Sequence, residues 1–162
     1  MLKGKDILNT AQFSLQELNL IMNTAANFER RVKNEEVIRN MEGKVVASLF
    51  FEPSTRTRLS FETAINRLGA RVVTIASAAS SSVAKGETLA DTIRTIDGYV
   101  DVIVMRHPMK GAAQLAADNA FSTSSVSSIS APLLLRSSVI FAGIFKDFGE
   151  TKIILFLHKA IK

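Results

Sequence analysis

Lys44-Val45-Val46-Ala47-Ser48-Leu49-Phe50-Phe51 is a nearly continuous apolar run, and Glu52-Pro53-Ser54-Thr55-Arg56-Thr57-Arg58 follows it directly. A run that is apolar on both faces predicts a strand buried within a parallel sheet, and Pro53 ends it. A helix is expected to open near Ser54 and to stop at Gly69. Free backbone N–H groups, the positive end of that helix and two guanidinium groups therefore meet at this turn, which suits it to binding a phosphate.

The side chains of this turn have two interpretations. Arginine offers a planar fork of donors that matches phosphate oxygens, and a hydroxyl can donate to a neighbouring carbonyl oxygen. The simpler interpretation is a helix capped by Ser54 whose arginines, Arg56 and Arg58, lie in solvent. Residue types alone leave both open.

Helices and strands are expected to alternate on either side of this turn. Ser14 and Glu17 form a capping-box pattern ahead of the first helix. The expected strands are 44–51, 71–75 and 101–105, the expected helices are 14–32, 54–68, 89–97 and 110–120, and 76–84 is expected to be a loop. This order predicts an α/β fold, a three-layer domain with a parallel sheet flanked by helices. Ligands of such sheets bind at the carboxyl ends of strands, here the turns after Phe51 and Met105.

Composition limits the class of protein. The 162 residues, 47% of them hydrophobic, suffice for one ordinary domain, and the absence of cysteine excludes disulfides and thiolate metal sites. The net charge of +5 is spread along the chain, so we expect no nucleic-acid partner, although charge alone leaves such a module possible. Neither apolar stretch of the tail, 133–145 or 153–157, reaches the ~20 residues of a membrane span. Without a signal-peptide pattern at the start, a cytoplasmic protein is expected.

Three strings in this chain resemble one enzyme family. Ser54-Thr55-Arg56-Thr57-Arg58 after a buried strand resembles the signature of the aspartate and ornithine carbamoyltransferases. The segment 81–88, Ser-Ser-Val-Ala-Lys-Gly-Glu-Thr, is similar to the family's mobile loop, and 104–108, Val-Met-Arg-His-Pro, is similar to its second phosphate-side arginine segment. The last two strings favour the aspartate enzyme, and ornithine carbamoyltransferase remains the near alternative.

The resemblance implies roles for individual residues. Ser54, Thr55, Arg56 and Thr57 would bind carbamoyl phosphate, with Arg56 neutralising the phosphate, Thr57 contacting the carbamoyl oxygen and Arg106 joining them. Arg56, Thr57, Arg106 and Lys85 would be the catalytic set.

The resemblance also implies contacts beyond this chain. Ser81 and Lys85 would reach into the active site of an adjacent subunit of a homotrimer, with Ser82 left open as the alternative to Ser81. Glu52 would bridge the two domains when they close around substrate. Regulatory chains are a further partner of the family.

The reaction implied is transfer of the carbamoyl group from carbamoyl phosphate to L-aspartate, which gives N-carbamoyl-L-aspartate and phosphate in pyrimidine biosynthesis. It requires no metal and no cofactor. Orientation of the two substrates and cations aimed at developing oxygen charge would supply the catalysis.

The resemblance covers residues 1–120, the expected carbamoyl-phosphate-binding domain, and 121–162 is an atypical tail that lacks the family's His-Pro-Thr-Gln string. We therefore expect the second, aspartate-binding domain to be missing, and the chain by itself to bind carbamoyl phosphate weakly without turnover. A non-catalytic subunit-interaction fragment is the alternative from another functional class.

Overall fold

The computed structural model describes residues 6–8, 10–75, 86–120 and 139–141. Within them the chain forms one short 3₁₀ helix, four α-helices and four strands. In chain order these are η1 (Thr10–Gln12), α1 (Leu15–Lys33), β1 (Val45–Phe50), α2 (Thr55–Arg67), β2 (Arg71–Ile75), α3 (Leu89–Asp97), β3 (Val102–Arg106), α4 (Ala112–Asn119) and β4 (Val139–Phe141). Helices and strands alternate as the sequence predicts.

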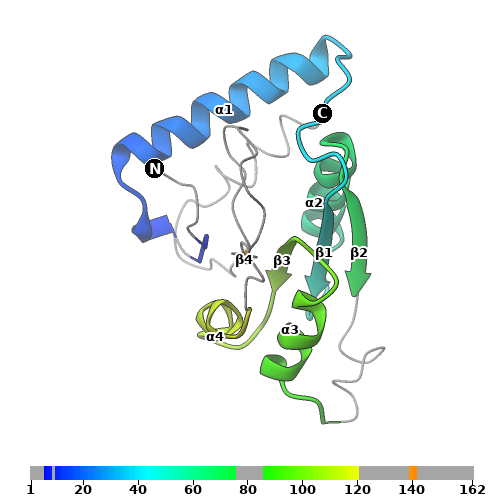
Figure 1. Ribbon diagram of the computed structural model, residues 1–162. Coiled ribbons are helices and arrows are strands. Elements are labelled where there is room, and N and C mark those ends of the chain that lie inside the picture. Colours follow the sequence, from blue (N-terminus) through cyan, green and yellow to red (C-terminus); the bar gives the residue numbers. More distant parts are fainter. Residues whose placement is uncertain (1–5, 9, 76–85, 121–138, 142–162) are drawn as a thin grey trace.

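The four strands form one parallel sheet in the order β2-β1-β3-β4 (Figure 1). From β1 the chain passes through α2 to β2 on one side, and it then returns through α3 to β3 on the other side of β1. The carboxyl ends of β1 and β3 therefore lie next to each other where the direction of winding changes, which is where open α/β sheets bind ligands.

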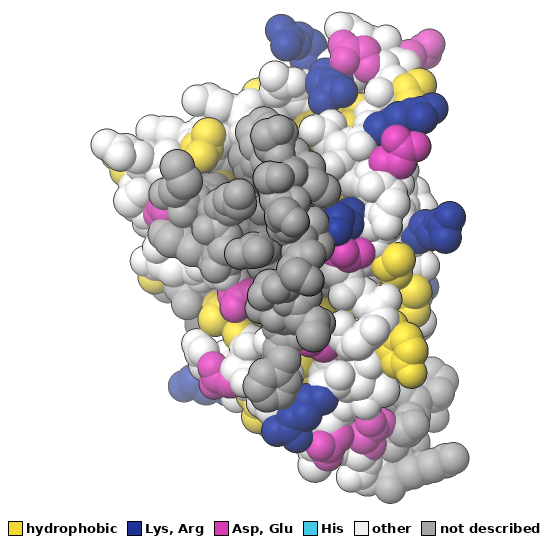
Figure 2. Space-filling model, viewed as in Figure 1, with side chains coloured by type: hydrophobic (Ala, Val, Ile, Leu, Met, Phe, Trp, Pro, Cys, Tyr) yellow, Lys and Arg dark blue, Asp and Glu magenta, His cyan; other side chains and the backbone are white. Residues whose placement is uncertain are grey.

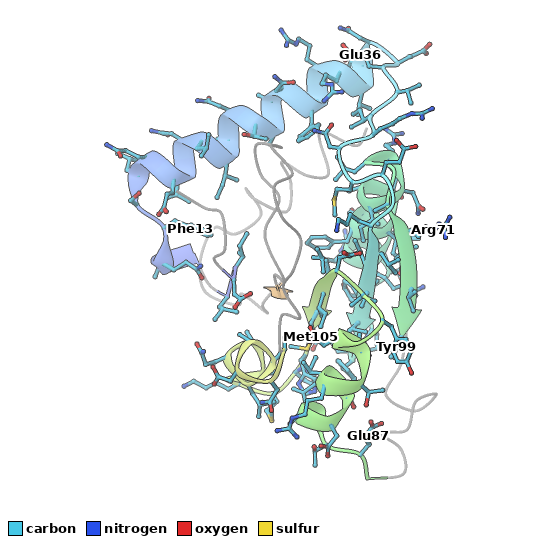
Figure 3. All side chains as sticks on the ribbon, viewed as in Figure 1. Phe13, Glu36, Arg71, Glu87, Tyr99 and Met105 are labelled. Atoms are coloured by element: carbon cyan, nitrogen blue, oxygen red, sulfur yellow. The ribbon has the colours of Figure 1, made fainter. Side chains whose placement is uncertain are left out.

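The sheet is covered on both faces, as expected for three layers. Val46 and Phe50 of β1 pack against α2 on one face, in a cluster with Phe61, Ile65, Ala70, Val102 and Val104. Ala47 and Leu49 face the other way, in a cluster with Ile93, Ile103, Met105, Ala112 and Ala116 of β3, α3 and α4. Met105, labelled in Figure 3, lies at the carboxyl end of β3 beside these two helices. The α/β prediction of a sheet flanked by helices is confirmed.

Strand β3 begins and ends one residue later than predicted, at Val102 and Arg106. At its end, the N–H of Phe51 donates to the carbonyl of Arg106 at 3.0 Å, which extends the pairing with β1 to that residue. At its start, the carboxylate of Asp101 accepts hydrogen bonds from Lys44 Nζ at 2.7 Å and from the backbone N–H of Val45 at 2.9 Å. Asp101 thus joins the amino ends of β1 and β3 through its side chain. The shift places Arg106 at the carboxyl end of the strand.

Two other elements bear on the sequence-based expectations. The capping box of α1 is present, since Ser14 Oγ accepts from the N–H of Glu17 and the Glu17 carboxylate accepts from the N–H of Ser14. Strand β4, a fourth strand that the sequence analysis did not predict, pairs in parallel with β3 in the segment 139–141, whose residues have strong β preference. Of the helices in the described part of the chain, not one combines the length and the apolar character needed to cross a bilayer.

Candidate functional site

The turn between β1 and α2 ends in a helix whose first N–H groups are available. Ser54 is the N-cap residue of α2, but its side chain makes no capping hydrogen bond. The first helical bond of α2 joins the N–H of Arg58 to the carbonyl of Ser54 at 3.0 Å. The preceding N–H groups, of Thr55, Arg56 and Thr57, have no acceptor among the described residues. An anion placed there would meet three donors and the positive end of the helix dipole.

Ser54 contacts Arg106 from the neighbouring strand. Phe50 and Arg106 are register partners in the β1–β3 ladder, and the N–H of Phe51 donates to the carbonyl of Arg106 at 3.0 Å. The Arg106 Nη1 group donates to Ser54 Oγ at 2.6 Å. The hydroxyl that a plain helix cap would use on its own backbone is therefore engaged by a guanidinium, which argues against the simple capping interpretation.

Glu52 completes this arrangement. Its carboxylate accepts a hydrogen bond from Arg106 Nε in a close ion pair. The Arg106 side chain is 25% exposed and that of Glu52 is 19% exposed, so the pair is partly shielded from water and its electrostatic attraction is stronger than that of a surface pair. Arg106 is thus held in place by Glu52 on one side and by Ser54 on the other.

His107, in the turn that follows β3, contacts Phe51 and Met109. Its ring lies 4.9 Å from the ring of Phe51, and its Nδ1 accepts a hydrogen bond from the N–H of Met109 at 3.0 Å. Burial lowers the pKa of His107 below its ordinary value, and the negative charge of Glu52 acts in the opposite direction. A neutral imidazole that accepts through Nδ1 fits both observations.

Arg56 is the exposed cation of the site. Its side chain has no carboxylate partner among the described residues, in contrast to Arg106. Thr55 beside it is exposed and Thr57 is half-buried. The arrangement therefore offers one unpaired guanidinium, one paired guanidinium and a set of hydroxyl and N–H donors to an anion.

The structure brings together most of the residues that the sequence analysis selected. Glu52, Ser54 and Arg106 are in direct contact, and Thr55, Arg56 and Thr57 form the first turn of α2 beside them. Ser81, Ser82 and Lys85 lie outside the described residues, so their contribution remains a prediction. Within the described residues, no group of three or more His, Asp or Glu side chains is arranged to hold a metal ion.

Two features of this region were not predicted from the sequence. One is the contact of His107 with Phe51. The position of His107 directly after Arg106 in the sequence was the signal that could have indicated it. The other is a polar cluster under α2, where Glu62 accepts hydrogen bonds from Ser48 and Thr74. A serine inside an apolar strand was the signal for that cluster.

The viewed face of the molecule carries both signs of charge. Figure 2 shows Lys and Arg side chains interspersed with Asp and Glu side chains over the residues described there. Such a mixed surface differs from the continuous basic stripe that is typical of nucleic-acid-binding domains.

Comparison with known proteins gives consistent matches. Residues 5–132 match the family model described as the aspartate/ornithine carbamoyltransferase carbamoyl-P binding domain. The aspartate carbamoyltransferase catalytic subunit of Thermococcus onnurineus is 52% identical over 116 residues, 72% of this chain and 37% of the relative. That of Picrophilus torridus is 53% identical over 115 residues, 71% of this chain and 38% of the relative.

Solved structures give the same result. The catalytic subunit of M. jannaschii aspartate transcarbamoylase superposes with a TM-score of 0.74 at 39% identity, covering 93% of this chain and 44% of that one. Aspartate transcarbamoylase from Trypanosoma cruzi in complex with carbamoyl phosphate superposes with a TM-score of 0.73 at 38% identity, covering 88% and 41%. The chain thus spans less than half the length of the proteins that it matches.

Proposed function

The chain belongs to the aspartate/ornithine carbamoyltransferase family, and from this premise we propose that the β1–α2 turn and Arg106 bind carbamoyl phosphate. The observation that carries the proposal is the contact between Ser54 and Arg106, which brings two sequence-distant parts of the site within 2.6 Å. A T. cruzi relative has been solved in complex with carbamoyl phosphate, and another of its structures contains both carbamoyl phosphate and aspartate.

Charge and geometry support the proposal that the phosphate end of the ligand lies at the helix start. The N–H groups of Thr55, Arg56 and Thr57 and the Arg56 guanidinium supply donors and positive charge for the phosphate oxygens. Arg106 supplies a second guanidinium from β3. The Thr57 hydroxyl would then contact the carbamoyl oxygen, which is the role that the resemblance implies.

Glu52 competes with the ligand for Arg106. The carboxylate pairs with Arg106 Nε in the structure, and a phosphate group bound at the turn would need the same donors. Binding is therefore expected to weaken the Glu52–Arg106 contact. The released carboxylate would then be available for the interdomain role that the resemblance implies.

The proposed reaction is attack of the amino nitrogen of L-aspartate on the carbamoyl carbon, with phosphate leaving from the resulting tetrahedral intermediate. Donors already directed at the phosphate stabilise the charge of the leaving group without reorganisation during the reaction. The residues described above serve the carbamoyl donor only. We propose the transfer step for a protein in which residues that bind L-aspartate are present beside these.

The curated relatives favour aspartate over ornithine as the acceptor. The relatives from Thermococcus onnurineus and Picrophilus torridus, which are 52% and 53% identical to this chain over the aligned residues, are named aspartate carbamoyltransferase catalytic subunits. A competition assay between L-aspartate and L-ornithine in an assembly with complete catalytic chains would distinguish the two. A homotrimer with Ser81 and Lys85 at the subunit boundary, an association with regulatory chains and a cytoplasmic location remain predictions.

The test is a calorimetric titration of the 162-residue chain with phosphonoacetamide, a stable phosphonate analogue of carbamoyl phosphate. We expect a saturable heat that Arg56→Ala removes, because the variant loses the unpaired cation of the site. Arg67→Ala is the matched control, since Arg67 ends the same helix at the far end from the site. No heat with wild type, or equal losses in the two variants, would contradict the proposal.

A further inference from the structure

The polar cluster under α2 joins the helix to the sheet. Glu62 Oε1 accepts a hydrogen bond from Ser48 Oγ of β1 at 3.0 Å and another from Thr74 Oγ1 of β2 at 2.9 Å. Ser48 and Thr74 are register partners in the β1–β2 ladder, and Ser48 is completely buried. One carboxylate oxygen of the helix thus spans two adjacent strands.

The same oxygen also attracts a guanidinium. Arg58 Nε lies 3.8 Å from Glu62 Oε1, and the two side chains are 31% and 18% exposed. This distance is too long for a hydrogen bond, and Arg58 Nε is buried without a hydrogen-bond partner among the described residues. A buried N–H group without a hydrogen-bond acceptor is costly, and here the negative charge of Glu62 nearby offsets part of that cost.

The cluster lies on the side of α2 that faces the sheet. Arg58 and Glu62 are four residues apart and therefore lie on one side of the helix, the side that also buries Phe61 and Ile65. At roughly 100° per residue, Arg56 leaves the helix about 200° from Arg58, which agrees with its exposure. Holding Arg58 toward the sheet keeps Arg56 away from it.

We propose that Glu62 is a positioning residue for the phosphate-binding turn, holding the first turn of α2 in the orientation that presents Arg56 and Thr57 to the ligand. It acts through Ser48, Thr74 and Arg58 and does not touch the ligand. The part that concerns ligand affinity rests on the proposed function. The orientation of the first turn is a property of the ligand-free chain and can be measured independently.

Two measurements on the full chain test the proposal. The first is the set of backbone amide resonances of residues 55–57, together with the Arg58 Nε–H resonance, recorded without ligand. The second is the dissociation constant for phosphonoacetamide. Glu62→Gln keeps an oxygen acceptor for the two hydroxyls but removes the charge opposite Arg58. Glu29→Gln is the matched control, because Glu29 forms a Glu–Lys pair of the same four-residue spacing on α1.

We expect Glu62→Gln to shift the resonances of 55–57 and of Arg58 Nε–H, and to weaken phosphonoacetamide binding roughly tenfold, since small displacements of binding groups have effects of this size or larger. Thr74→Val, which keeps the β-branched shape on β2, should cause smaller changes in the same direction. Glu29→Gln should leave both measurements unchanged. If Glu62→Gln fails to fold, Thr74→Val decides.

Unchanged resonances of 55–57 in the folded variant would overturn the positioning role, as would equal shifts in Glu62→Gln and Glu29→Gln. Absence of phosphonoacetamide binding by wild type would instead count against the proposed function. The ligand-free resonances would still decide whether Glu62 orients the turn. The two failures are therefore distinguishable.

Discussion

Glu52→Gln is expected to strengthen phosphate binding, the opposite of what most substitutions in a binding site do. Glu52 pairs with Arg106, the residue that also contacts Ser54. Glutamine keeps an oxygen that accepts from Arg106 Nε, so the arginine stays in position. The negative charge that repels an incoming phosphate and competes for the guanidinium is removed.

The magnitude follows from the exposure of the pair. A carboxylate and a phosphate charge near a protein surface repel each other by roughly 1–4 kcal/mol at about 4 Å, depending on the effective dielectric constant. Glu52 is 19% exposed and Arg106 is 25% exposed, so water screens part of this effect. We take about 1 kcal/mol after screening, which corresponds to about a fivefold tighter dissociation constant. The gain should shrink as salt is added.

The assay is a calorimetric titration with inorganic phosphate at low and moderate ionic strength. Glu42→Gln is the control, because Glu42 also pairs with an arginine, Arg39, but precedes β1 at the far end of the sheet. The control should bind phosphate as wild type does. Weaker binding in Glu52→Gln would refute the reasoning, since it would mean that Glu52 supports the site instead of competing with the ligand.

Three further outcomes are expected. Arg106→Ala should weaken phosphonoacetamide binding by roughly 30-fold or more in calorimetry, because a charge-assisted contact contributes about 2 kcal/mol, and a change no larger than that of Arg67→Ala would contradict it. The pKa of His107 is lowered in the folded chain, so the free energy of unfolding measured in urea should be at its full value above pH 6.5 and should fall as the pH falls below it. His107→Gln should flatten this pH dependence. An unaltered pH profile in that variant would exclude His107 as its source. Asp101→Asn should lower the free energy of unfolding by about 1–3 kcal/mol, since Asp101 accepts from Lys44 and Val45, and urea denaturation that matches wild type would show that this contact is unimportant.

The helices and strands in the described part of the chain could largely be predicted because local patterns determine them. The apolar run 44–51 and the capping pair Ser14 and Glu17 each identified an element at nearly its observed bounds. The order of elements predicted a parallel sheet, and that in turn placed the turns after β1 and β3 together.

Contacts between sequence-distant side chains could not be predicted in the same way. The pairing of Glu52 with Arg106 depends on the register that sets Phe50 opposite Arg106, and the Glu62 cluster depends on the register of Ser48 with Thr74. Neither register follows from residue periodicity alone. The contacts of Asp101, just before β3, are of the same kind, because they join residues more than fifty positions apart.

The central claim concerns where a phosphate group binds, and a crystal structure of the chain with phosphonoacetamide would test it most directly. The account predicts phosphonate oxygens within hydrogen-bond distance of the N–H groups of 55–57 and of the Arg56 and Arg106 guanidinium groups. Electron density for the analogue at another place, with this turn unoccupied at a saturating concentration, would contradict the account.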